Sequence, residues 1–422
     1  MKVHFIGIGG IGVSALAQYY LDKGHEVTGF DLANSEITEF LKKKGVKFKK
    51  EADENTDLII HTPAMPFSDP ELTQAMGKGI SIMSYPEALG ELTKQYFTIA
   101  VSGTHGKSTT SSMIGLLLEK AGLDPTVVIG TKLKEFGNTN FRAGKSKYLV
   151  IEADEWNRSF LSYWPRIIVL TTVEEEHMDT YKDMDDILET YGKYVQHLSL
   201  EGIIVGNGDD KNVSKITSDN PKLKSYSLGL PEAEKLREIL RVPGEHNVSN
   251  ALAALTVARE LGIPDDISFQ ALGEFKGSWR RFEEKNVKLG NKRVKTISDY
   301  GHHPTEVKAT LLAAKQKYCK KKIWCVFQPH QYQRTYYLFK DFVEVFKGAD
   351  LDRIIITDIY DVAGREKKDV SKKVSSKKLV GKIRKDNVIY LAKEKIKNYL
   401  KKNVDKEVVI IMGAGDIYKI LE

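Results

Sequence analysis

A glycine-rich loop carrying a lysine and a hydroxyl residue is the strongest chemical signal in this sequence. Residues 101–110 read V-S-G-T-H-G-K-S-T-T, between an apolar run that predicts a strand and a stretch with helical periodicity. A phosphate needs backbone N–H donors, a cation and close approach, and glycines before a helix N-terminus provide these. We therefore expect Lys107 to reach the phosphates of a nucleotide and Ser108 to join a Mg²⁺ shell. The strict P-loop pattern has glycine five positions before Gly106, where this chain has Val101.

Two acidic strings follow apolar runs that should form strands near this loop. The string E-A-D-E at 152–155 follows the run 148–151, and the string E-E-E-H at 174–177 follows the run 167–170. Parallel strands end at one edge of a sheet, where α/β proteins bind ligands. Because Mg²⁺ prefers oxygen ligands, Glu152 is a candidate metal ligand. The alternatives are a solvated acidic turn and a histidine with a structural role.

A second glycine-rich loop lies at the N-terminus. Residues 7–12 read G-I-G-G-I-G after an apolar strand-like run, and Asp31 ends the next predicted strand. This fits the fingerprint of dinucleotide-binding proteins and, alone, would favour an NAD-dependent oxidoreductase. It fits any diphosphate near a helix N-terminus equally well, including that of a UDP-sugar.

The last third of the chain contains two dense polar strings. S-D-Y-G-H-H-P at 298–304 and F-Q-P-H-Q-Y-Q-R-T at 327–335 each lie between a predicted strand and a predicted helix. Two such strings at equivalent positions favour a ligand-facing surface over ordinary loop polarity.

Strands and helices alternate along the whole chain, which predicts parallel sheets in three successive α/β segments. We place these segments at 1–95, 96–277 and 278–422. The predicted strands are 3–7, 26–30, 46–48, 58–61, 97–101, 148–151, 167–170, 294–298, 323–327, 353–357, 388–391 and 408–412. The predicted helices are 13–21, 35–44, 108–121, 246–261, 304–318, 335–347 and 393–401.

Composition narrows the function classes. With 41% hydrophobic and 29% charged residues, the 422-residue chain has the composition of a globular protein. The N-terminus lacks the pattern of a secretion signal, no apolar run reaches membrane length, and Cys319 and Cys325 fit no zinc or disulfide pattern. The basic tract 365–385 has no interleaved aromatic residues. We therefore expect a cytoplasmic protein with no nucleic-acid or membrane partner.

Taken together, these strings resemble the Mur ligases of peptidoglycan synthesis. The resemblance runs from Val3 to Tyr418 and is strongest to members that join L-alanine to UDP-N-acetylmuramate. Its markers are F-I-G-I-G-G-I-G, D-L-A-N-S-E-I-T, G-T-H-G-K-S-T-T, E-A-D-E, E-E-H-M-D, G-E-H-N-V-S-N-A-L-A-A, R-R-F-E, D-Y-G-H-H-P-T-E, F-Q-P-H-Q-Y-Q-R-T and M-G-A-G-D. The family implies an N-terminal Rossmann-like domain for the UDP-sugar, a central P-loop-type ATPase domain and a C-terminal Rossmann-like domain for the amino acid.

The resemblance also implies a reaction that uses ATP and Mg²⁺. The carboxylate of UDP-N-acetylmuramate attacks the γ-phosphate, and the amine of an amino acid, L-alanine, then displaces phosphate from the acyl phosphate. The implied catalytic residues are Lys107, Glu152, His177 and His330, and the implied metal ligands are Ser108, Glu152 and His177. The implied ATP-binding residues are Gly103, Thr104, His105, Gly106, Lys107, Ser108, Thr109, Asn247, Asn250, Arg280 and Asp299. The implied UDP-sugar site comprises Gly9, Ile11, Gly12, Asp31 and Ser35, and the amino-acid site comprises Tyr300, His330 and Arg334.

The chain departs from the family pattern at several of these strings. Ser108 stands where Thr is usual, Trp156 and Asn157 replace Ser and Asp, Thr172 and Glu176 replace Asn and Asp, and Gln331 replaces Arg. Gln cannot reproduce the charged fork of Arg, so the acceptor stays open between L-alanine and a ready-made tripeptide. A non-catalytic Mur-like nucleotide-binding protein and an NAD-dependent oxidoreductase are the remaining alternatives. A monomer and a homodimer are both compatible with the sequence.

Overall fold

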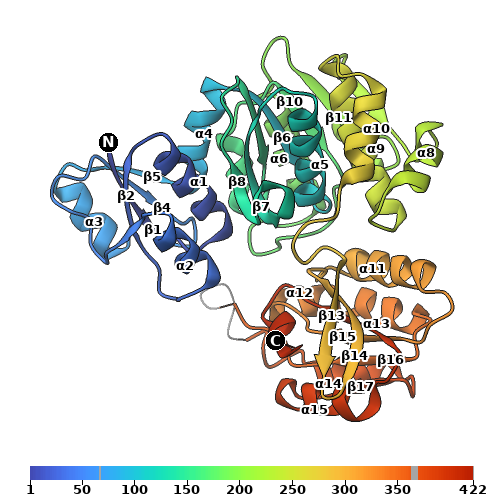
Figure 1. The fold of residues 1–422 in the computed structure, drawn as a ribbon. Coiled ribbons are helices and arrows are strands. Elements are labelled where there is room, and N and C mark those ends of the chain that lie inside the picture. The colour runs from blue at the N-terminus through green and yellow to red at the C-terminus, as the bar shows by residue number, and fades with distance from the viewer. Residues whose placement is uncertain (66–67, 363–368, 422) are drawn as a thin grey trace. The chain divides into compact units, whose positions relative to one another are not determined.

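The computed structural model describes residues 1–65, 68–362 and 369–421, which form three α/β domains, each built on its own sheet (Figure 1). The chain divides into two compact units. The first unit holds the N-terminal and central sheets, and the second holds the C-terminal sheet with segments 175–183 and 240–248. Among the described helices, none has both the length and the apolar character to cross a bilayer.

The N-terminal sheet has five parallel strands in the order β3-β2-β1-β4-β5. The strands are β1 (Lys2–Ile6), β2 (Glu26–Phe30), β3 (Lys47–Phe48), β4 (Leu58–His61) and β5 (Ser81–Ser84). The helices are α1 (Ile11–Asp22), α2 (Glu36–Lys43), α3 (Pro70–Gly77) and α4 (Tyr85–Gln95). The strand order reverses at β1, so the loop after β1 lies at the point where such sheets bind ligands.

The central sheet has seven strands in the order β12-β11-β10-β6-β9-β7-β8, and only the edge strand β8 is antiparallel to its neighbour. The strands are β6 (Phe97–Ser102), β7 (Thr126–Leu133), β8 (Thr139–Arg142), β9 (Tyr148–Glu152), β10 (Ile167–Leu170), β11 (Ile203–Asn207) and β12 (Leu223–Tyr226). The helices are α5 (Lys107–Lys120), α6 (Met184–Val195), α7 (Lys211–Thr217), α8 (Glu232–Ile239), α9 (Glu245–Glu260) and α10 (Asp265–Glu274), with 3-10 turns η1 (Lys134–Phe136) and η2 (Trp156–Ser162). The strand order reverses at β6, which leads into the glycine-rich loop before α5.

The C-terminal sheet has six strands in the order β13-β14-β18-β15-β16-β17, with β13 antiparallel to β14. The strands are β13 (Glu283–Leu289), β14 (Lys292–Asp299), β15 (Ile323–Phe327), β16 (Arg353–Ile356), β17 (Val388–Tyr390) and β18 (Val408–Met412). The helices are α11 (Pro304–Lys317), α12 (Tyr332–Tyr337), α13 (Phe339–Gly348), α14 (Ser376–Ile383) and α15 (Lys393–Asn403), followed by the 3-10 turn η3 (Ile417–Leu421).

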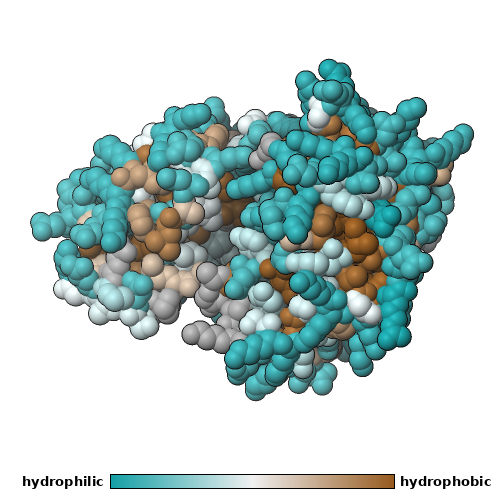
Figure 2. All heavy atoms as spheres, turned by 90° about the horizontal axis from the view of Figure 1, so that it is seen from below, coloured by the Kyte–Doolittle hydropathy of each residue, from teal (hydrophilic) through white to brown (hydrophobic). Residues whose placement is uncertain are grey.

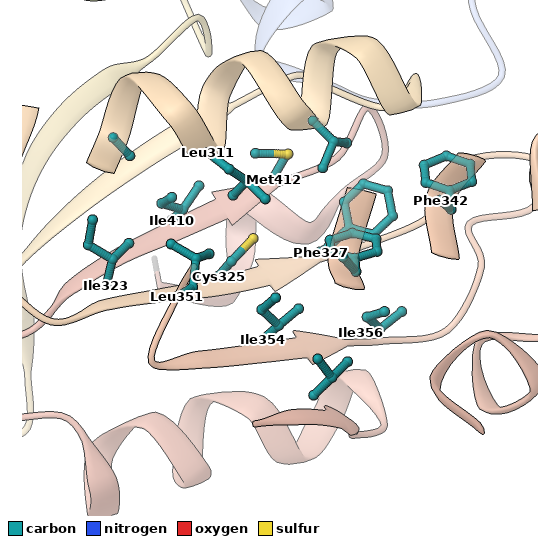
Figure 3. Close-up of a cluster of buried hydrophobic side chains, with 14 of the residues drawn as sticks. Leu311, Ile323, Cys325, Phe327, Phe342, Leu351, Ile354, Ile356, Ile410 and Met412 are labelled. Atoms are coloured by element: carbon teal, nitrogen blue, oxygen red, sulfur yellow. The ribbon is translucent and has the colours of Figure 1, made fainter. Parts of the chain in front are cut away.

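Each face of the C-terminal sheet carries its own core. On one face, Phe327 and Phe342 pack with aliphatic residues of the strands and of α11 (Figure 3). Phe346 and residues of α14 belong to the same core. On the other face, Trp324 packs with Ile396 and other aliphatic residues of α15 and η3. Burying apolar side chains on both faces is why the strands read as continuous apolar runs in the sequence.

Each predicted strand and helix corresponds to an observed element, with one exception at the polar string 327–335. The single helix predicted over 335–347 is wrong, because α12 ends at Tyr337 and α13 begins at Phe339. The polar string 327–335 therefore enters a helix at Tyr332, three residues earlier than its predicted start.

Charged and hydrophilic residues cover most of the molecular face drawn in Figure 2, as expected for a chain with 29% charged residues. In the basic tract 365–385, residues 365–368 lie outside the described residues. The rest includes α14, whose exposed side carries lysines. Of the two cysteines, Cys319 is exposed and Cys325 is buried in the core of the C-terminal sheet.

Candidate active site

The loop after β6 adopts a conformation that requires glycine at two positions. Gly103 has φ of +134° and Gly106 has φ of +86°, in the region that L side chains rarely occupy. A Cβ on Gly103 would lie 2.2 Å from Oγ1 of Thr171, and a Cβ on Gly106 would lie 2.4 Å from Oδ1 of Asn250. The two glycines thus let the loop turn tightly against β10 and α9.

The loop is fixed to the residues that follow β10. The Thr104 N–H donates to the Thr172 carbonyl at 2.7 Å, and the His105 N–H donates to Thr172 Oγ1 at 3.0 Å. The Thr171 hydroxyl donates to the His105 carbonyl at 2.6 Å. Thr172, which replaces the asparagine usual in the family pattern, therefore supports the loop through its own side-chain oxygen.

Lys107 begins helix α5 and makes an ion pair with a buried carboxylate. Its Nζ donates to Glu155 Oε2 at 2.8 Å and Oε1 at 3.1 Å, and to the Gly103 carbonyl at 2.6 Å. Burial would lower the pKa of Lys107, but Glu155, with Asp154 and Glu152, outweighs burial and raises that pKa above its ordinary value. Lys107 therefore remains a cation at the N-terminus of α5, where phosphate binding needs one.

Ser108 and Glu152 lie together beside Lys107. The Ser108 hydroxyl donates to Glu152 Oε2 at 3.0 Å, and Glu152 Oε1 accepts the Gly130 N–H at 2.6 Å. A hydroxyl and a carboxylate at hydrogen-bond distance are hard oxygen donors, the set that Mg²⁺ prefers. Thr109 follows in the first turn of α5 and is buried.

Asn250 supports the loop from helix α9. Its side-chain Oδ1 accepts the Thr110 hydroxyl at 3.2 Å and lies against Gly106. Because one buried amide contacts both the loop and the next turn of α5, Asn250 positions these backbone segments as well as any ligand near them.

The loop after β1 is held from the end of β2. The Gly9 N–H donates to Asp31 Oδ2 at 2.8 Å, and a Cβ on Gly9 would lie 2.8 Å from that oxygen. Ile11 and Gly12 form the first turn of α1, and Ser35 caps α2 with its side chain. These five predicted UDP-sugar residues lie around the first turn of α1 and the start of α2, where backbone N–H groups favour an anion.

In the second unit, Arg334 of α12 is buried and paired. Its Nε donates to Glu176 Oε1 at 2.9 Å, and its Nη1 donates to Nδ1 of His330 at 3.0 Å. Burial would raise the pKa of Glu176, but Arg334, aided by neighbouring histidines, holds that pKa well below its usual range. The His330 ring stacks on Tyr360 with centroids 5.6 Å apart.

Arg280 and Asp299 are also buried in the second unit. The Arg280 guanidinium lies 4.2 Å from the ring centre of Tyr418 and 4.9 Å from that of Tyr300, and it donates to the Gly413 carbonyl. Asp299 accepts the Phe282 N–H at 2.8 Å, and burial raises its pKa. Both side chains therefore have structural partners in addition to the ATP contacts predicted for them.

The structure brings most of the predicted residues together in groups. The first unit gathers Gly103, Thr104, His105, Gly106, Lys107, Ser108, Thr109, Glu152 and Asn250 around one loop. The second unit contains His177, Asn247, Arg280, Asp299, Tyr300, His330 and Arg334. Within that unit, His177 has φ of +57°, and Asn247 Nδ2 donates to the Pro243 carbonyl at 2.7 Å.

The pairing of Glu155 with Lys107 and that of Glu176 with Arg334 are not predictable from the sequence pattern. Both glutamates lie in the acidic strings 152–155 and 174–177, and each has other acidic residues close by in sequence. Their low exposure, 3% for Glu155 and 8% for Glu176, is what separates them from those neighbours.

Models of three domain families match successive parts of this chain. The Mur ligase family catalytic domain matches residues 2–97, the Mur ligase middle domain matches residues 101–258, and the Mur ligase glutamate ligase domain matches residues 280–415. Together they cover most of the sequence.

Individual proteins match over the full chain. A protein named UDP-N-acetylmuramate–L-alanine ligase from Clostridium acetobutylicum is 40% identical over an alignment of 453 positions, which covers 100% of this chain and 96% of the relative. The crystal structure of a UDP-N-acetylmuramate–alanine ligase from Thermotoga maritima is similar with a TM-score of 0.79 and 26% identity, covering 100% of this chain and 97% of that one. A murein peptide ligase from Psychrobacter arcticus shares the fold, with a TM-score of 0.73, 22% identity and coverage of 100% and 97%.

Proposed function

This chain belongs to the Mur ligase family, and we propose on that premise that it uses ATP to join L-alanine to the carboxylate of UDP-N-acetylmuramate. The carboxylate attacks the γ-phosphate of ATP to give an acyl phosphate and ADP. The amine of L-alanine then attacks the acyl carbon, and phosphate leaves. The reaction supplies a precursor of peptidoglycan.

One observation carries this proposal more than any other: Lys107 and Ser108 start a helix directly after a glycine turn, and Glu152 lies 3.0 Å from the Ser108 hydroxyl. The turn and the helix N-terminus supply N–H donors for phosphates, and Lys107 supplies the cation. Phosphoryl transfer requires positioned positive charge more than covalent chemistry, so this arrangement matches its main demand.

We assign Ser108 and Glu152 to one Mg²⁺ ion, and we assign His177 to a second metal ion. The hydroxyl oxygen of Ser108 and the carboxylate oxygens of Glu152 fit the first ion, because Mg²⁺ takes oxygen ligands. Bound there, Mg²⁺ would neutralise charge on the transferring phosphoryl group. Lys107 would neutralise charge on the same group from the protein side.

The remaining roles follow the three domains, which we place at 1–95, 96–277 and 278–422. The N-terminal domain holds the UDP-sugar at Gly9, Ile11, Gly12, Asp31 and Ser35. ATP contacts the loop from Gly103 to Thr109 together with Asn247, Asn250, Arg280 and Asp299. The amino acid binds at Tyr300, His330 and Arg334. We further propose that the enzyme works in the cytoplasm, as a monomer or homodimer without nucleic-acid or membrane partners.

Gln331 favours one alternative acceptor, a ready-made tripeptide joined to the same UDP-sugar. Gln331 lies in the polar string 327–335, at a position where the family pattern has arginine. An amide cannot bind a carboxylate as a charged fork. In a tripeptide the terminal carboxylate lies further from the reacting amine than in L-alanine. Binding of a tripeptide therefore depends less on a cation at position 331.

The test is phosphate release by the purified protein with UDP-N-acetylmuramate, ATP and Mg²⁺, screened over amino acids and the tripeptide, with the product identified by mass. We expect release with L-alanine and a product heavier by one alanyl residue. Lys107→Ala should abolish release. Lys120→Ala, which alters an exposed lysine at the other end of α5, should retain it. Release with the tripeptide alone would establish the alternative, and no release with any acceptor would refute both.

A further inference from the structure

Arg334 is anchored through two of its three guanidinium nitrogens. Its Nε donates to Glu176 Oε1 at 2.9 Å, while Nη1 donates to Nδ1 of His330 at 3.0 Å and to the His330 carbonyl at 3.1 Å. Within residues 1–65, 68–362 and 369–421, Nη2 makes no hydrogen bond. Its two N–H bonds are therefore the part of the guanidinium left for a ligand.

The contact with Arg334 also determines which ring nitrogen of a neutral His330 carries the proton. Arginine only donates hydrogen bonds, so Nδ1 of His330 must carry the lone pair. The ring proton of a neutral His330 then lies on Nε2. In this arrangement Nε2 of a neutral His330 is a donor, so it cannot take a proton from an amine.

Two departures from the family pattern lie near Arg334, one in contact with it and one in the turn before it. Glu176 stands where aspartate is usual and binds Arg334 directly, and Gln331 stands one helical turn before it in place of a second arginine. The Gln331 N–H donates to the Tyr360 carbonyl at 2.9 Å, and its carbonyl accepts the Thr335 hydroxyl at 2.7 Å. The backbone of Gln331 thus starts α12, but its neutral side chain brings no charge to the site.

We propose that Glu176 is a positioning residue for the acceptor: it holds Arg334 so that Nη2 binds the carboxylate of an acceptor that carries that group beside its reacting amine. This inference rests on the proposed function and names the part of the acceptor that the site recognises. A pre-oriented arginine loses less side-chain freedom on binding, so one fixed guanidinium can replace part of what a second arginine would supply.

The burial of the pair makes this role specific to Glu176. The side chains of Arg334 and Glu176 are 6% and 9% exposed, so their interaction is little weakened by solvent. The neighbouring Glu175 is exposed and has the same charge. Glu175→Gln is therefore a matched control for Glu176→Gln.

The experiment compares the full-length wild-type protein with Glu176→Gln, Glu176→Asp and Glu175→Gln in the phosphate-release reaction. We expect Glu176→Gln to raise KM for L-alanine about tenfold or more, because the hydrogen bond from Arg334 Nε loses the negative charge of its acceptor. KM for ATP and for UDP-N-acetylmuramate should stay near wild-type values. Glu176→Asp should recover part of the effect, and Glu175→Gln should behave as wild type.

A second acceptor separates positioning from a structural role. L-Alaninamide has the same amine and side chain but no carboxylate, so wild type should use it poorly. Glu176→Gln should cause no further loss with this acceptor, because the contact it weakens is not formed. Thermal unfolding of each variant, with and without ATP, checks that the fold persists.

The possible results distinguish the positioning role of Glu176 from the proposed ligase activity. An unchanged KM for L-alanine in Glu176→Gln, or an equal loss with L-alaninamide, would overturn the positioning role while leaving the ligase activity intact. A wild-type protein that neither consumes ATP with an amino acid nor binds one in calorimetry would overturn the proposed function and this inference together.

Discussion

The Nζ of Lys107 lies 2.8 Å from Oε2 of Glu155, so the cation at the start of α5 is already paired with a carboxylate. The side chains of Lys107 and Glu155 are only 16% and 4% exposed. An arriving nucleotide must therefore compete with Glu155 for this lysine, and the phosphates must approach a negative charge.

Replacing Glu155 should consequently strengthen nucleotide binding while weakening the fold. We expect Glu155→Gln to bind ADP roughly tenfold more tightly, about 1.4 kcal/mol. The same variant should lose about 1–3 kcal/mol of unfolding free energy, because buried Lys107 loses its charged partner. Calorimetry with ADP and a metal chelator measures the affinity without a contribution from metal.

The neighbouring acid supplies the control for this prediction. Asp154 is exposed, and its Oδ1 accepts the Trp156 N–H. Asp154→Asn removes the same charge without breaking the ion pair, so its effect should be smaller. Weaker ADP binding by Glu155→Gln would mean that Glu155 holds Lys107 in the binding position instead of competing for it.

The tight turn at Gly103 gives a second prediction. In Gly103→Ala, positive φ strain and the clash with Thr171 should displace the loop and lower phosphate release about a hundredfold. Gly122 has φ of +75°, but a Cβ added there would meet none of the described atoms within 4 Å. Gly122→Ala should therefore cost about 1–2 kcal/mol of stability from strain alone and keep wild-type turnover. Equal activity losses in both variants would contradict the steric account of the loop.

Buried His4 predicts how stability changes with pH. His4 is fully buried in β1 beside the Thr28 hydroxyl at 2.8 Å, and burial lowers its pKa from 6.5 to about 4, against a smaller opposing effect of Asp53. Between these two values the unfolded chain binds a proton that the folded chain does not. This group's contribution to stability is therefore present above pH 6.5 and is lost as the pH falls to about 4, by at most about 1.4 kcal/mol per pH unit.

The measurement is urea unfolding of wild type and His4→Gln at several pH values in that window. The stability of wild type should fall more steeply with decreasing pH than that of His4→Gln. Parallel curves for the two proteins would show that His4 does not contribute to the acid sensitivity.

Much of the fold could be predicted from the sequence, because apolar runs and helix caps are local signals. The strand predicted at 58–61 is β4, and the helix predicted from residue 304 is α11, which has Pro304 in its first turn after the cap at His303. The hairpin of β13 and β14 was missed, although Gly290 and Asn291 between alternating residues are a typical turn signal.

The site could be predicted less completely, because its pairings join residues far apart in the chain. The phosphate loop was recognisable since Gly103, Gly106 and Lys107 lie in one string. No local pattern indicates that Glu155, out of several neighbouring acids, meets Lys107. Helix α12 begins after Gln331, whose φ of +70° is not helical, and helical periodicity does not reveal such a start.

The most direct test of the central claim follows the oxygen atoms of the sugar carboxylate. UDP-N-acetylmuramate labelled with ¹⁸O in its carboxylate is converted with ATP, Mg²⁺ and L-alanine, and the released phosphate is analysed by mass. An acyl phosphate carries one carboxylate oxygen to phosphorus, so the account predicts one ¹⁸O in each phosphate released from fully labelled substrate. Unlabelled phosphate, or phosphate formed without an alanylated product, would contradict it.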